Sequence, residues 1–238
     1  MSYHCHLSDV LPQRPRPKAP DLALLFYDDV LLKHPVLDTP EGYELGAGRL
    51  LGTEDIGTLI TRLAQQQSLV MTRANTLACG VGKVVWWLPP STRPLVFAAK
   101  YEQTKSIARL SHQPVPLPGL VLCAAERSLQ VFAVRGRERP EAHTPLCHAP
   151  FWNIFSHGAV CQGSVTYPKE ATPQQQEKWE EAFFNSTFTG PSRTDRYMNW
   201  GKSYEELLDK AIREGAFPEH VLIDSGKTLE NVVLGGGK

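Results

Sequence analysis

Hydrophobic residues follow a helical period in one early stretch of the chain. Large aliphatic side chains recur at i, i+3, i+4 and i+7 from Ile56 to Leu63, which places them on a single helix face. Thr53 precedes this stretch as a cap. The two acidic residues directly after Thr53 suit the positive N-terminus of a helix. The pattern predicts a helix from Thr53 to about Gln67.

Apolar runs bounded by proline, glycine and aspartate predict strands on both sides of this helix. Before it, residues 22–27 and 30–37 flank Asp28-Asp29 and predict a hairpin, with a further short strand between Tyr43 and Leu51. After it, four runs predict an antiparallel meander: Val81–Leu88, Leu95–Ala99, Leu120–Ala125 and Leu129–Val134.

Two helices are predicted in the last third of the chain. Thr172-Pro173 begins one, with threonine as the cap and proline in the first turn. Ser203 begins the other, forms a capping box with Glu206, and is followed by a stop at Gly215.

The elements together predict an α+β fold: an N-terminal helix, an antiparallel four-strand meander, an irregular loop and C-terminal helices, preceded by a β extension. Four segments are expected along the chain. They are a proline-rich flexible lead-in at 1–20, the β extension at 21–52, the main domain at 53–215 and a C-terminal tail at 216–238.

Composition narrows the class of protein. Of the 238 residues, 42% are hydrophobic and 21% are charged, which suits a globule with a substantial core. The 25 basic and 25 acidic side chains cancel, so no strong attraction to nucleic acid or to anionic membrane is implied. There is no signal-peptide pattern and no apolar stretch of about 20 residues, the length that spans a bilayer. The expected location is the cytoplasm.

Five cysteines, an odd number in a chain of this length, indicate reduced thiols rather than a disulfide framework. Residues 147–165 concentrate the candidate chemistry, because two cysteines, two histidines and an asparagine lie there among aromatic residues. Cys161 is a candidate nucleophile. Asn153, eight residues earlier, can supply an oxyanion donor, and Ser156-His-Gly158 can form a turn that folds it back towards the thiol.

Two other interpretations of this segment stay open. It can be a structural loop in which Cys161 is a buried strand residue and the aromatic and aliphatic residues 151, 152, 154 and 155 are core anchors. It can also bind zinc through Cys147, His148, His157 and Cys161, although it lacks a Cys-x-x-Cys knuckle. His4-Cys5-His6 at the N-terminus is a second candidate metal site, or a mobile surface tip.

The motif His148-Ala-Pro-Phe-Trp-Asn153, followed by Gly158-Ala-Val-Cys161, resembles the active site of ubiquitin-conjugating enzymes. In that fold a His-Pro-Asn tripeptide lies eight residues before the catalytic cysteine. The same motif and Trp-x-x-Ala-Phe-x-x-Ser-x-Phe at 179–188 resemble the PRTRC system protein B family, a divergent prokaryotic branch of the fold. The resemblance covers roughly residues 50–215.

The resemblance implies a cysteine transferase that uses no metal and no cofactor. Cys161 would accept a ubiquitin-like protein as a thioester from a ThiF-type activating enzyme, and a JAB-type peptidase is a further implied partner. Asn153 would steady the active-site loop or the oxyanion, and His148 would correspond to the motif histidine. His148, Pro150 and Asn153 are not contiguous here, and no acidic residue matches the group that often assists an attacking lysine. An inactive binding member of the same fold is the alternative.

Overall fold

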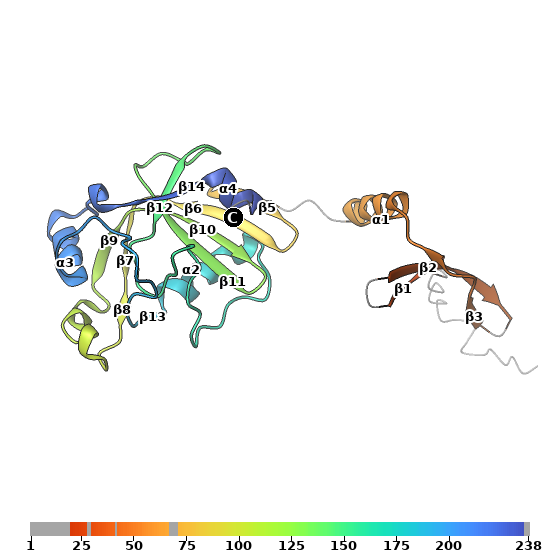
Figure 1. Ribbon diagram of the computed structural model, residues 1–238, viewed down its shortest axis with the longest axis horizontal. Helices are drawn as coiled ribbons and strands as arrows, with labels where there is room; N and C mark the ends of the chain where they lie inside the picture. Colours follow the sequence, from red (N-terminus) through yellow and green to blue (C-terminus); the bar gives the residue numbers. More distant parts are fainter. Residues whose placement is uncertain (1–19, 28–29, 41, 67–70, 236–238) are drawn as a thin grey trace, which may run out of the picture. The chain divides into compact units, whose positions relative to one another are not determined.

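The computed structural model describes residues 20–27, 30–40, 42–66 and 71–235 (Figure 1). The chain divides into two compact units, Met1–Val70 and Met71–Lys238. The first unit contains the β extension and the first helix, and the second contains residues 147–165.

The first unit is a small antiparallel sheet followed by one helix. Its elements are β1 (Leu22–Tyr27), β2 (Val30–Thr39), β3 (Gly42–Leu45), β4 (Arg49–Leu50) and α1 (Thr53–Gln66). Tyr27 lies opposite Val30 in the β1–β2 pair, which confirms the predicted hairpin; its two turn residues lie outside the described residues. Both β3 and β4 pair with β2. The helix has the predicted limits within one residue, and the Asp55 carboxylate accepts a hydrogen bond from the Gly52 amide at 3.0 Å.

The second unit is built on a six-stranded antiparallel sheet with the order β14-β12-β11-β10-β6-β5 (Figure 1). Its strands are β5 (Thr76–Gly80), β6 (Lys83–Leu88), β10 (Gly119–Ala125), β11 (Ser128–Val134), β12 (Pro145–His148) and β14 (Asp224–Thr228). The protein therefore has a mixed α+β architecture with mostly antiparallel sheets, as predicted.

The predicted four-strand meander is wrong in one member, Leu95–Ala99. This run contains β8 (Val96–Phe97), which pairs in parallel with β13 (Thr187–Phe188) outside the main sheet, while β6 pairs directly with β10. Between β6 and β10 the chain forms a separate ribbon of β7 (Ser91–Pro94) and β9 (Pro114–Leu117). Prolines in β7 and β9 explain why this ribbon lies outside the main sheet, because proline has no amide hydrogen to donate to the neighbours of a central strand.

The two faces of the main sheet carry separate cores. The larger core lies against α2 (Gln176–Phe184) and α3 (Tyr204–Glu214) and includes Phe151 and Trp152 of the 147–165 segment. Phe155, expected as a core anchor if the segment is a structural loop, is exposed instead. The smaller core lies under α4 (Leu229–Leu234). The capping box of Ser203 with Glu206 is confirmed, and Gly215 ends α3 in the left-handed conformation with φ of 67°. A 3-10 turn at Pro173–Gln175 precedes α2, and two further turns, Glu102–Thr104 and Ile107–Leu110, follow β8.

The expected tail at residues 216–238 is wrong over most of its length. It contains a 3-10 turn (Glu219–Val221), the edge strand β14 and α4, and Val221 and Leu229 are buried. The sequence Asp-Ser-Gly-Lys-Thr of β14 has no apolar alternation, so only its backbone pairing with β12 makes it a strand. The predicted main domain, residues 53–215, therefore differs from the second unit at both ends. Among the described residues, no helix is long and apolar enough to cross a membrane.

Candidate functional site

Cys161 is exposed and lies at the end of a tight hairpin-like turn. Its backbone amide donates to the Asn153 carbonyl at 2.7 Å, and the Phe155 amide donates to the Ala159 carbonyl at 2.9 Å. These bonds close the turn at residues 156–158 and bring Asn153 beside Cys161. The predicted turn is therefore confirmed, and the interpretation of Cys161 as a buried strand residue is wrong.

Gly158 allows this turn to lie flat against the main sheet. Its φ is +92°, and a Cβ atom at this position would come within 2.5 Å of the Phe132 ring on β11. The Gly158 carbonyl accepts a hydrogen bond from the Val131 amide at 2.9 Å, and the Val160 amide donates to the Leu129 carbonyl at 2.8 Å. A side chain at residue 158 would push the turn away from β11, and Cys161 with it.

Cys161 opens into a cavity of about 390 Å³. Three separate segments form its walls: the cysteine segment itself, the stretch that follows α2, and the loop that follows β8. Most of the lining side chains are small or carry a hydroxyl, including Ala98, Gly163, Ser186 and Thr187. The cavity wall beside the sulfur is therefore formed mainly by small and hydroxyl-bearing side chains.

The Asn153 side chain holds the wall of this cavity together. Its Nδ2 donates to the Thr187 carbonyl at 2.9 Å, and its Oδ1 accepts from the Thr189 amide at 3.1 Å and from the Thr189 hydroxyl at 3.0 Å. Its backbone amide donates to the Gly190 carbonyl at 2.9 Å, and its φ is 57°, in the left-handed region that asparagine tolerates well. This geometry favours loop positioning over donation to an oxyanion.

His148 lies on β12 and is absent from the lining of the Cys161 cavity. Its Nε2 is 3.3 Å from a guanidinium nitrogen of Arg193, which fixes that ring nitrogen as the acceptor. Burial, and then the positive charge of Arg193, lowers the pKa of His148. The arrangement favours a neutral, structural histidine, and the structure does not bring it together with Cys161 as it does Asn153.

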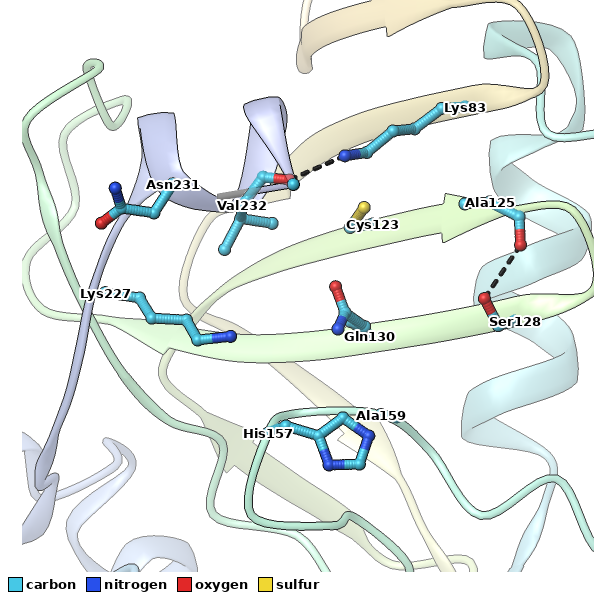
Figure 2. Close-up of a pocket in the computed structure, with 11 residues that line it drawn as sticks. Lys83, Cys123, Ala125, Ser128, Gln130, His157, Ala159, Lys227, Asn231 and Val232 are labelled. Carbon is cyan, nitrogen blue, oxygen red and sulfur yellow. Dashed lines mark hydrogen bonds between the residues drawn. The ribbon is translucent and has the colours of Figure 1, made fainter. Parts of the chain in front are cut away.

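His157 lies on the tip of the turn and faces a different cavity. Its ring stacks on Phe155 with centroids 5.9 Å apart and an interplanar angle of 4°. Figure 2 shows it beside a pocket of about 500 Å³ that is also lined by Lys83, Cys123 and Lys227. Neither histidine of the 147–165 segment therefore lines the Cys161 cavity.

The other cysteines of the described residues differ from Cys161. Cys123 and Cys147 are buried in the main sheet, and burial raises the pKa of both thiols. Cys79 is exposed on β5. The zinc interpretation loses support, because within the described ranges no group of three or more His, Cys, Asp or Glu side chains is placed to hold a metal ion. His4-Cys5-His6 lies outside the described residues.

The family model of prokaryotic E2 family D matches residues 55–225. The chain belongs to prokaryotic E2 family D. E2 proteins are the conjugating enzymes of ubiquitin-like pathways, so this membership connects the chain with ubiquitin-like conjugation. Searches of curated proteins and of solved structures find no match. The matched range spans both units of the chain and includes the whole cysteine segment.

Sequence reasoning missed part of this E2-family site. Thr187 and Thr189 form the part of the cavity wall that the Asn153 side chain binds. The only signal for them in the sequence is that they lie next to Ser186 of the 179–188 motif. Tyr167, which lines a neighbouring cavity, was not singled out either. It is 8% exposed and stacks on Trp179 with centroids 4.9 Å apart. Burial, and then negative charge on the Cys161 sulfur, raises the pKa of Tyr167 to about 12, so its hydroxyl stays protonated beside the site.

Proposed function

We propose that Cys161 carries a small ubiquitin-like protein as a thioester and accepts it from a ThiF-type activating enzyme. The observation that carries this proposal is the exposed Cys161 beside Asn153, in a cavity of small residues, in a chain that belongs to an E2 family. Cys161 is the reacting residue. Asn153 is proposed as the residue that positions the loop, and the contacts of His148 support a structural role for it.

The chemistry requires little more than an accessible thiol. The Cys161 thiolate attacks the thioester carbonyl of the charged activating enzyme, the new C–S bond forms, and the enzyme's thiolate leaves. Because this donor is already activated, the step does not need a strong general base. The described lining of the cavity includes neither a histidine nor a carboxylate, which is compatible with a step that needs no strong general base.

A finer resemblance supports the choice of partners. The resemblance of residues 148–161 and 179–188 to PRTRC system protein B points to a cassette with a ubiquitin-like protein, a ThiF-type enzyme and a JAB-type peptidase. We propose these as the partners. We also propose the cytoplasm as the location, because charging consumes ATP and needs a reduced thiol.

A second candidate is a binding member of the fold that never carries the thioester. The lack of an acidic side chain in the described lining of the cavity favours it in one respect, since nothing there would assist the deprotonation of an incoming lysine. Transfer to an acceptor protein is therefore less well supported than formation of the thioester.

A charging assay separates these candidates. The protein is incubated with the cassette's activating enzyme, ATP and ubiquitin-like protein, and the products are resolved with and without dithiothreitol. We expect a thiol-sensitive adduct that disappears in Cys161→Ala and persists in Cys79→Ser, the matched exposed cysteine. An adduct that survives Cys161→Ala contradicts the assignment, and no adduct with the wild type favours the binding role.

A further inference from the structure

We propose that Lys100 is an acceptor in the same molecule: its amine receives the acyl group from Cys161 and becomes modified by an isopeptide bond. This inference rests on the proposed function only in requiring that Cys161 can hold an acyl group. It adds a modification site and a second fate for the thioester, which is stable self-modification rather than onward transfer.

The position of Lys100 is the first observation. It lies in the loop after β8, and this loop is tied to the cavity wall because the Ala98 amide donates to the Phe188 carbonyl at 3.0 Å. Lys100 is exposed, and it lines the same 390 Å³ cavity as Cys161. It is the one lysine in the described lining of that cavity.

The freedom of its amine is the second observation. Within the described residues no carboxylate lies within 4.0 Å of the Lys100 ammonium, whereas the nearby Glu102 pairs with Lys105. The Lys100 ammonium instead lies 5.0 Å from the centroid of the Tyr101 ring. An exposed contact of this kind is weak, so it leaves the Lys100 side chain free to change its rotamer.

These two observations place Lys100, with no carboxylate partner among the described residues, and Cys161 in the lining of one small cavity. Holding two reactants together converts a bimolecular step into a unimolecular one, and effective concentrations for well-oriented pairs are very high. An outside lysine would have to find the site and lose its proton there without help. Lys100 is already present in the lining of the cavity, so no encounter with a second molecule is needed.

The transfer balances without any further reactant. The unprotonated Lys100 nitrogen attacks the thioester carbonyl, a C–N bond forms, and the C–S bond breaks with its electron pair on sulfur. The Cys161 thiolate takes up the proton that the nitrogen loses. The products are an amide at Lys100 and a free Cys161 thiol, and nothing is oxidised or reduced.

A chemical probe tests this without the cassette enzymes. The full chain, with Cys5 and Cys79 replaced by serine, is incubated with a short peptide that ends in glycine as a 2-mercaptoethanesulfonate thioester. Thioester exchange loads Cys161 directly. We expect a mass increase of one peptide that resists dithiothreitol, maps to Lys100 in proteolytic fragments, and forms at a rate independent of protein concentration.

Matched variants decide the outcome. Lys100→Arg should still load Cys161 but form the resistant product at least tenfold more slowly, while Lys178→Arg, an exposed lysine at the neighbouring cavity, should match the wild type. Cys161→Ser should form none. The proposal is overturned if a loaded thioester decays only by hydrolysis, if the amide maps to another lysine, or if Cys161 does not load. Failure of the enzymatic charging assay, by contrast, contradicts the proposed carrier function alone.

Discussion

Replacement of Asn153 by alanine tests whether this residue positions the loop or serves the chemistry. The substitution removes three hydrogen bonds, to the Thr187 carbonyl and to the amide and hydroxyl of Thr189. Each is worth about 1 kcal/mol net, and alanine in the left-handed region costs about 1 kcal/mol more. Because the site is only partly buried, we expect Asn153→Ala to lower the free energy of unfolding by about 3 kcal/mol.

Two companion variants divide this loss into its parts. Asn153→Gly also loses the side-chain bonds but accepts the φ of 57°, so it should be more stable than the alanine variant by about 1 kcal/mol. Thr189→Ala removes only the hydroxyl partner of Asn153 and should cost about 1 kcal/mol. In the Asn153→Ala background the same threonine change should cost less, because the shared bond is already gone.

The assay combines urea unfolding of each variant with charging measured where every variant is folded. If Asn153 positions the loop, charging should follow stability across the series. A loss of stability below about 1 kcal/mol in Asn153→Ala, or equal stability of the alanine and glycine variants, would refute the reasoning from these hydrogen bonds. An alanine variant that is fully stable but unable to charge would instead assign Asn153 to the oxyanion.

Two further predictions concern the turn and the neighbouring strand. Gly158→Ala should destabilise the protein by about 3 kcal/mol, because residue 158 combines a positive φ with a close approach to Phe132. Gly163→Ala should cost about 1 kcal/mol, because Gly163 has a φ of 53° but no neighbour within 4 Å. Urea unfolding measures both. For His148 the pKa is lower in the folded state, so the folded protein binds fewer protons. The contribution of neutral His148 to the free energy of unfolding should be fully present above about pH 6.5 and be lost as the pH drops through the folded pKa. Urea unfolding from pH 7.5 to 5 measures this loss, and His148→Gln should lose less stability over the same range.

Features with a local cause could be predicted from the sequence. The capping box at Ser203 and the stop at Gly215 involve residues within one turn of each other, so they fix the ends of α3. The Ser156–Gly158 turn is equally local, and it was sufficient to predict that Asn153 returns to Cys161. The two short-range signals together located both the last large helix and the centre of the site.

Features that depend on distant pairing could not be predicted. Strand β14 lies in the main sheet through its backbone bonds to β12, and β8 lies outside that sheet, where it pairs with β13. The partners of the Asn153 amide are 34 and 36 residues away, with no periodicity to connect them. The expectation that Asn153 steadies the loop or the oxyanion named neither of these partners, because they come from a distant segment of the chain.

The surroundings of Cys161 restrict which acyl donors it can use. A neutral thiol needs a base to attack an unactivated amide or ester, and the described lining of the cavity holds neither a histidine nor a carboxylate. A thiolate can exchange with a donor whose leaving group is another thiolate, because bond breaking then needs no proton. The same lining holds the Tyr101 ring and the amine of Lys100, which can accept an acyl group once unprotonated. These features support the proposed order of events, in which Cys161 first receives an acyl group from a thioester and then passes it to the Lys100 amine.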